Sequence, residues 1–348
     1  MSILTNDASS TASTTSARTA AADGITEDEA KLYDRQLRLW GVEAQNRMRS
    51  AHVLLAGSFR GVSTEVAKNI VLAGIGKLTL LDHRTVEWSD LGSGYWEREE
   101  DIGLKRVEVV APRLQLLNPR VQISTQTDSE LLQDEAFLKT FDLVVLTDVE
   151  AQTISRVNNL TRKLNKKFFA ASSIGIHGWV FADLLQHDFI IDQQKAAAPG
   201  EPTTTVPLKL SHSYCSFDDM LAHDFSTTPK SKLRKKTWSK RQVLWAVLTL
   251  FHLELEDAGQ TVTNESLAKK REEVFERSKV PKTESVEDEV ISRFVSLLGH
   301  EFAPSCAIVG GILGQDVLNA IGGKEEPVRN LMVFDGDSGE GGVWSLGC

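Results

Sequence analysis

Residues 52–65, "HVLLAGSFRGVSTE", contain a strand, a turn and the start of a helix, from which much of the fold can be inferred. A short apolar run ends at Gly57, as a buried strand does where it enters a phosphate-binding turn. A nucleotide-binding turn in this frame usually reads G-x-G-x-x-G. Here its glycines are Gly57 and Gly61, and Phe59 and Arg60 stand between them. The turn therefore keeps the frame of a nucleotide loop but contains two bulky side chains.

Strands and helices alternate from this turn onward. We expect strands at 52–57, 77–82, 121–125, 141–148 and 167–173, with helices at 62–73, 104–117, 129–139 and 150–164. Continuous apolar strands that alternate with helices indicate a parallel sheet covered on both faces. The prediction is therefore a doubly wound, Rossmann-like α/β fold with a mostly parallel sheet.

The pattern changes after about residue 175. We expect antiparallel strands at 178–191, a loop over 192–210, helices near 240–257, 264–278 and 286–299, a helix at 304–323, and closing strands at 330–336 and 341–346. The predicted organisation is a disordered tail (1–24), an α/β domain in two parts (25–185 and 301–348), and a helical insert between them (186–300). The tail is rich in Ser, Thr and Ala and has no apolar core, so it is not a secretory signal.

A helix is predicted for the segment that follows the tail, "ITEDEAKLYDRQLRLWG" (25–41). Thr26 and Glu29 have the spacing of a capping box, in which each side chain bonds the other residue's main-chain N–H. Gly41 is expected to end the helix.

Composition and charge exclude several classes of protein. The net charge of −9 disfavours a nucleic-acid partner, and no run approaches the length of a membrane span, so neither partner is predicted. The three cysteines are far apart and form no C-x-x-C pair, which indicates neither a disulfide framework nor a zinc site. A reducing compartment, the nucleus or the cytoplasm, is expected. The basic run at 230–241 fits a nuclear-import signal, a solvated helix entry or a contact with an acidic partner.

Several segments, taken in this order and spacing, resemble one family, the ThiF/MoeB-type adenylating domain of the enzymes that activate ubiquitin-like proteins. They are "YDRQLRLWG" (33–41), "AKNIVLAGIGKLTLLD" (67–82), "DIGLKRVEVVAPRLQLLNP" (101–119), "FDLVVLTD" (141–148), "APSCAIVGGILGQDVLNAI" (303–321) and "FDG" (334–336). Within the family, the total length and the modest insert are similar to the small, non-thioester subunits of the SUMO-activating heterodimers.

The resemblance implies chemistry that this chain does not support alone. Such enzymes join ATP to a C-terminal carboxylate, which a cysteine then takes as a thioester. The counterparts of the family's nucleotide-site residues are degenerate remnants here: Gly57, Gly61, Asp82 at the ribose position, Arg106 in place of a Lys, and Asp148 at the Mg²⁺ position. Val149 replaces an Asn, and "SDLGSGYWER" (89–98) lacks the expected Asn and Arg. The resemblance implies that ATP and Mg²⁺ are bound by a large catalytic partner subunit, which also binds most of SUMO, and that this chain holds no metal.

One catalytic piece of the family is intact. The Arg of its Y-x-R-Q segment, Arg35 here, is implied to reach across the dimer to the partner's ATP phosphates. A guanidinium can contact phosphate oxygens bidentately. The alternative is that Arg35 is a solvent-facing helix residue paired with Asp34 or Glu29.

Other features leave alternatives open. Cys306 lies in an apolar helix start and is expected to be a buried structural thiol. Cys215 has His212 nearby in the sequence, but this adjacency does not prove an activated thiolate, so a role as nucleophile is the less favoured interpretation of Cys215. The glycines at 310, 311 and 314 permit close packing, against a dimer partner or against this chain's own sheet. Asp335 is expected to close a turn. As functions we keep a regulatory subunit, a self-sufficient homodimeric adenylating enzyme and a scaffold-only subunit; an NAD-dependent oxidoreductase would need the G-x-G-x-x-G that is missing.

Overall fold

The computed structural model describes residues 25–195, 204–228 and 241–348, so the predicted tail and nearly all of the basic run lie outside the described residues. The helices are α1 (Glu27–Leu32), α2 (Asp34–Ser50), α3 (Gly61–Ala73), α4 (Arg106–Gln115), α5 (Glu135–Lys139), α6 (Ala151–Lys163), α7 (Phe217–Leu221), α9 (Gln242–Glu256), α10 (Asn264–Arg277), α11 (Asp288–Leu297) and α12 (Ala303–Gly322). The strands are β1 (His52–Gly57), β2 (Lys77–Leu81), β3 (Gln122–Gln126), β4 (Leu143–Thr147), β5 (Lys167–Ile174), β6 (His177–Asp183), β7 (Gln186–Lys195), β8 (Thr204–Ser213), β9 (Leu331–Asp335) and β10 (Glu340–Trp344).

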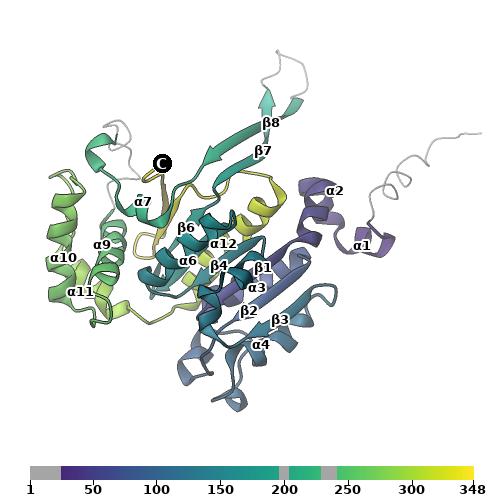
Figure 1. Ribbon diagram of the computed structural model, residues 1–348, viewed down its shortest axis with the longest axis horizontal. Helices are drawn as coiled ribbons and strands as arrows, with labels where there is room; N and C mark the ends of the chain where they lie inside the picture. The colour runs from purple at the N-terminus through teal and green to yellow at the C-terminus, as the bar shows by residue number, and fades with distance from the viewer. Residues whose placement is uncertain (1–24, 196–203, 229–240) are drawn as a thin grey trace, which may run out of the picture.

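The central sheet has eight strands in the order β10-β9-β6-β5-β4-β1-β2-β3. The five strands from β1 to β5 pair in parallel, as their apolar runs predicted. The pairs β5–β6, β6–β9 and β9–β10 are antiparallel. Strand β1 is the middle one of the five parallel strands, with β4 and β2 beside it, and the chain reverses its direction of winding there (Figure 1). This is the doubly wound arrangement that the sequence predicted.

Two hydrophobic cores lie on opposite faces of the sheet. Successive side chains of a strand point to opposite faces, and β1 contributes Leu54 to one core and Val53 and Leu55 to the other. The first core is completed by α6, α7 and the insert helices α9 to α11, and the second by α2, α3, α4 and α12. The insert helices therefore share a core with the sheet instead of forming one of their own.

The N-terminal helix begins as predicted and has an interruption that was not predicted. Thr26 Oγ1 accepts from the N–H of Glu29 (3.3 Å), and Glu29 Oε2 accepts from the N–H of Thr26 (3.0 Å), which confirms the capping box. The helix is interrupted at Tyr33, and Gly41 (φ +82°) produces a kink. Gly41 has non-helical backbone angles and separates two helical segments of α2, so the first segment ends there as predicted and a second segment runs on to Ser50.

The prediction of a loop over 192–210 is wrong for the part of this range that the structure describes. Strands β7 and β8 pair over their full lengths as an antiparallel ribbon that projects from the body of the molecule (Figure 1). Proline and three threonines favoured a loop, but Val206, Leu208 and Leu210 alternate with other residues at the two-residue period of a strand.

Helix α12 packs against α3 of its own chain. An added Cβ on Gly310 would lie 2.6 Å from Glu65 Cβ, and one on Gly314 would lie 3.0 Å from Asn69 Cβ. Gly311 faces open space, so the close-packing role falls on the other two glycines. By length and apolar composition α12 also reaches the size of a membrane span, contrary to our expectation, but 67% of that apolar stretch is buried, as in a core helix.

Candidate functional site

The turn after β1 lies at the carboxyl end of the parallel strands, where it touches β4 and α12. Gly57 has a φ of +117°, and an added Cβ would lie 2.1 Å from the carbonyl oxygen of Thr147. An added Cβ on Gly61 would lie 2.7 Å from Cys306 Sγ. Both glycines are therefore needed for close packing of the turn, independently of any ligand. We call the main chain of residues 57–61, with the N-terminus of α3, the cradle.

Phe59 and Arg60 belong to the cradle, and their side chains are engaged by the protein itself. Phe59 is only 2% exposed and belongs to the core formed with α3 and α12. Its N–H donates to Asp82 Oδ2 (2.8 Å). Arg60 Nε lies 3.4 Å from Asp90 Oδ1 and 3.4 Å from Glu301 Oε2. The cation nearest the cradle is thus already paired with carboxylates of the chain.

Glu301 places its carboxylate at the N-terminus of α3. Its Oε2 accepts from the N–H of Gly61 (3.2 Å) and from the hydroxyl of Ser93. The first N–H groups of a helix have no partner within the helix, and with the helix dipole they form the site where phosphates usually bind. A carboxylate of this chain holds that position, so a nucleotide phosphate does not fit the cradle as it stands.

Arg106 is buried at the centre of an ion-pair network behind the cradle. It donates from Nε to Asp90 Oδ2 (2.7 Å) and from Nη2 to Asp90 Oδ1 (3.0 Å). Its Nη1 donates to Ser58 Oγ (3.0 Å) and lies 3.5 Å from Asp82 Oδ2. Asp82 also accepts from the N–H groups of Phe59 and Arg84. The carboxylate predicted for the ribose position is therefore engaged by donors of the protein.

Asp148, the residue at the family's Mg²⁺ position, follows β4 with a φ of +51°. Its Oδ1 accepts from the hydroxyl of Ser172 (2.7 Å) and the N–H of Ser173 (3.3 Å). Oδ2 is buried without a hydrogen-bond partner among the residues that the structure describes, as is Glu301 Oε1. Burial, together with the negative charge of Glu301, raises the pKa of Asp148 to about 7.

This raised pKa predicts a pH-dependent stability. A carboxyl group whose folded pKa is raised stabilises the fold most below its unfolded pKa near 4, and that stability is lost as the pH rises through 7. Asp148→Asn should therefore be about as stable as the unsubstituted protein at pH 3–4 and more stable at pH 8, by on the order of 1.4 kcal/mol per unit of pKa shift. Urea unfolding at both pH values measures the difference.

The exposed Asp192 provides a matched control for that experiment. Asp192→Asn should show the same stability as the unsubstituted protein at both pH values. A difference at Asp148 that does not change between pH 4 and pH 8 would contradict the assignment of a raised pKa.

Arg35 lies on the exposed side of α2, which is at the margin of the molecule (Figure 1). The acids proposed as its alternative partners are engaged elsewhere, because Asp34 pairs with Arg38 (3.0 Å) and Glu29 pairs with Arg49 (3.4 Å). Within the described part of the chain, Arg35 itself has no hydrogen bond or ion pair. The alternative of a pairing with Asp34 or Glu29 is therefore wrong, and the guanidinium is available to a molecule outside this chain.

Neither interior cysteine, Cys215 or Cys306, offers an activated nucleophile. Cys215 is buried, and its thiol is hydrogen-bonded to the carbonyl oxygen of Leu346 (3.1 Å). His212 faces Glu326 (Nε2–Oε1 2.8 Å) and is not paired with Cys215. Burial raises the pKa of Cys306 to about 12, as expected of a structural thiol.

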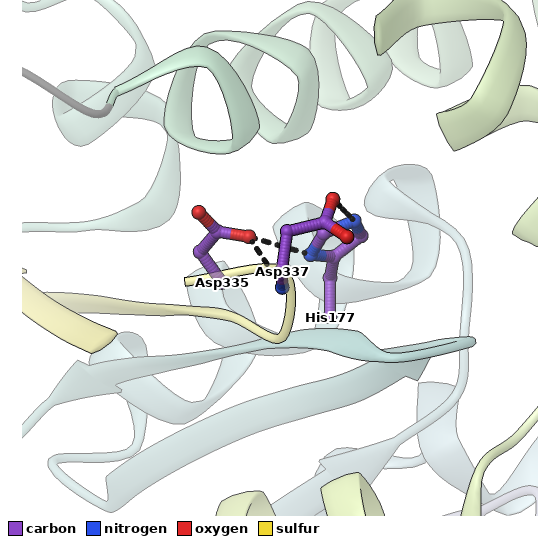
Figure 2. Close-up of side chains that lie close together, drawn as sticks. All are labelled: His177, Asp335 and Asp337. Carbon is purple, nitrogen blue, oxygen red and sulfur yellow. Dashed lines mark hydrogen bonds and ion pairs between the residues drawn. The ribbon is translucent and has the colours of Figure 1, made fainter. Parts of the chain in front are cut away.

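One group of side chains among the described residues resembles a set of metal ligands, and it consists of His177, Asp335 and Asp337 (Figure 2). Their ligand atoms all lie within 4.8 Å of one another. Each, however, has partners in the protein: the N–H of Gly336 donates to His177 Nδ1 (3.2 Å), the Ser338 hydroxyl donates to Asp335 (2.8 Å), and Arg293 pairs with Asp337 (2.7 Å). This network closes the turn between β9 and β10, which agrees with the turn predicted at Asp335.

A comparison with known protein families decides the classification, because a model described as the ThiF family matches residues 33–344. The chain belongs to the ThiF family. SUMO-activating enzyme subunit 1 of Homo sapiens is 34% identical over 343 residues, which cover 94% of this chain and 98% of that protein. DNA damage tolerance protein RHC31 of Saccharomyces cerevisiae is 35% identical over 338 residues, or 90% and 95% of the two chains. The predicted resemblance to the small subunits of SUMO-activating enzymes is confirmed.

Solved structures of other ThiF-like proteins agree on the fold. PaaA superposes with a TM-score of 0.55 at 15% identity, over 92% of this chain and 84% of that chain. MccB of E. coli superposes with a TM-score of 0.54 at 14% identity, over 90% and 71% of the two chains. The predicted ThiF/MoeB-type fold is confirmed, and at these identities the comparison concerns the fold alone.

Glu301 is the site residue that sequence reasoning missed. It stands 240 residues from Gly61, in "GHEFAPS", between the insert and α12. A single glutamate before a helix has no motif around it. The available signal was the presence of Arg60 in the cradle, because a cation introduced there needs an acidic partner.

Proposed function

We propose that this ThiF-family chain is the regulatory subunit of a heterodimeric SUMO-activating enzyme, and that it contributes Arg35 in trans to the ATP site of its partner. The partner, a large catalytic subunit, would bind ATP and Mg²⁺, most of SUMO, and the thioester. Relatives that are named as SUMO-activating enzyme subunit 1 and cover almost the whole chain support the pathway. The division of labour between the subunits rests on the geometry of this chain.

The single observation that carries the proposal is the carboxylate of Glu301 on the N-terminus of α3. ATP brings a triphosphate to such a helix end, and a carboxylate already bound there repels it and takes its N–H donor. Arg60 and Arg106, which stand where cations would meet the phosphates, are paired with Asp82, Asp90 and Glu301. The residues present therefore do not fit ATP.

Arg35 is the group with which this chain acts on the reaction. ATP supplies the adenylyl group that is joined to the carboxylate of SUMO. An exposed guanidinium that has no partner among the described residues can donate to two phosphate oxygens at once, where negative charge accumulates as the adenylate forms. Helix α2 lies at the margin of the fold (Figure 1), and the exposed side chains near its N-terminal end, Arg35 among them, can enter a neighbouring subunit without displacing the core.

The proposal predicts that the purified chain alone does not bind ATP. Isothermal titration of the isolated chain with ATP and Mg²⁺ should give no heat of binding at tens of micromolar protein, whereas the assembled heterodimer should bind one nucleotide. Micromolar affinity in the isolated chain would favour the alternative of a self-sufficient homodimeric enzyme.

The remaining alternative is a scaffold-only subunit that stabilises its partner. Like the regulatory subunit, a scaffold-only subunit would not bind ATP, and it differs from the regulatory subunit only in giving Arg35 no role in the reaction.

We also propose a nuclear location, with some of the protein in the cytoplasm, because basic runs such as 230–241 act as import signals.

A further inference from the structure

Two thiols meet on the side of the molecule remote from the cradle. Cys215 Sγ and Cys348 Sγ lie 2.6 Å apart, although the residues are separated by 133 positions in the chain. Cys215 follows β8 and Cys348 follows β10. Neither cysteine takes part in the site described above.

Hydrogen bonds hold the two segments together. Asn330 Nδ2 donates to the carbonyl oxygen of Leu346 (2.9 Å) and to Cys215 Sγ (3.0 Å). The N–H of Leu346 donates back to Asn330 Oδ1 (3.0 Å). Asn330 is fully buried, so the position of the segment that carries Cys348 is fixed by the core and not by chance contact at the surface.

The two thiols differ in accessibility and in acidity. Cys348 is exposed, whereas Cys215 is 7% exposed. The hydrogen bond between them lowers the pKa of Cys348, with a further contribution from the charge of Arg329, and the same bond and burial raise the pKa of Cys215. Since the thiolate is the reactive form, an oxidant in solvent meets Cys348 first.

We propose that Cys215 and Cys348 are a redox modification site, in which a hydroperoxide converts the pair to a reversible disulfide. The Cys348 thiolate attacks the distal oxygen of the hydroperoxide, the O–O bond breaks, and the alcohol or water leaves as Cys348 becomes a sulfenic acid. The Cys215 sulfur then attacks the Cys348 sulfur, and the S–OH bond breaks to release water while the Cys215 proton is lost to it. Two thiols are oxidised by two electrons and one hydroperoxide is reduced.

The disulfide would connect the segment after β10 to the segment that enters α7. The segment that enters α7 joins the β7–β8 ribbon to the insert helices, and these helices share a core with the sheet. A cross-link that closes a long loop restricts the unfolded chain. The oxidised protein should therefore melt several degrees higher than the reduced protein, and dithiothreitol should reverse the shift.

The test is a titration of the full chain with hydrogen peroxide, followed by thiol counting and non-reducing peptide mapping. Free thiols should fall from three to one, and trypsin should release residues 210–230 joined to residues 330–348. Cys306→Ser should form the same linked peptides. Cys348→Ser should keep Cys215 reduced, and Cys215→Ser should accumulate sulfinic acid at Cys348.

Three results would overturn the proposal. One is a native protein that keeps three free thiols under peroxide while an unrelated exposed thiol reacts. Another is Cys348 oxidised to sulfinic acid in the unsubstituted protein without the linked peptides. The third is linked peptides that form equally well in guanidinium, since pairing would then not depend on the folded contact.

Discussion

Replacing Arg35 with alanine in the assembled heterodimer should slow SUMO-dependent ATP–pyrophosphate exchange by about 100-fold, with little effect on assembly. Loss of one preorganised donor to a developing charge typically costs two to three orders of magnitude in rate. The side chain is exposed and has no partner within the described residues, so its removal should leave the free energy of unfolding unchanged. The rate of exchange and the elution of the complex in size-exclusion chromatography measure the two effects.

A neighbouring arginine provides the matched control. Arg38 is exposed on the same helix and pairs with Asp34, and Arg38→Ala should exchange pyrophosphate at the normal rate. Arg35→Lys should give an intermediate rate, because an ammonium keeps the charge but lacks the planar fork. Unchanged exchange in Arg35→Ala would leave the scaffold-only alternative.

Replacing Arg106 with methionine should lower the free energy of unfolding by about 3–5 kcal/mol, the usual cost of removing one partner of a buried ion pair. The substitution leaves the buried carboxylate of Asp82 without its cation and leaves that of Asp90 with Arg60 alone, at 3.4 Å. Guanidinium unfolding of the isolated chain measures the loss. The expected effect lies in stability, because Arg106 supports the fold here instead of meeting a phosphate.

Two further variants make this result specific. Arg84 is exposed beside the same strand end, and Arg84→Met should cost less than 1 kcal/mol. Adding Asp90→Asn to Arg106→Met should restore part of the lost stability, because it removes one of the carboxylate charges that Arg106 pairs with. An Arg106→Met protein as stable as the Arg84→Met protein would contradict the buried network.

The parallel part of the fold was predictable because its signals are local. Five apolar runs separated by helical segments predict five parallel strands, and β1 to β5 pair in that way. The β7–β8 ribbon was missed because Pro207 and its neighbouring threonines are typical of a loop, whereas the strand pairing that stabilises them comes from 9 to 15 residues away. Local propensity does not contain that partner.

Within the candidate site, the sequence predicted which nucleotide-site residues are degenerate, but it did not predict which side chain of the protein lies at the phosphate position. Phe59 and Arg60 stand inside the motif and could be recognised there. Glu301 and the contact between Cys215 and Cys348 join positions 240 and 133 residues apart, which only the folded chain brings together. Interactions of this kind are set by tertiary packing, and a single sequence carries no spacing rule for them.

We propose that the cradle of this chain binds no nucleotide and that Arg35 acts on the nucleotide of the partner. The most direct test of both claims is the structure of the heterodimer with ATP and Mg²⁺. The distance to measure joins the Arg35 guanidinium to the nearest phosphate oxygen. Our account predicts about 2.7–3.0 Å to the nucleotide in the partner subunit, with Glu301 still bound to the N–H of Gly61. A nucleotide whose phosphates displace Glu301 from the N-terminus of α3, or an Arg35 that remains in solvent, would contradict it.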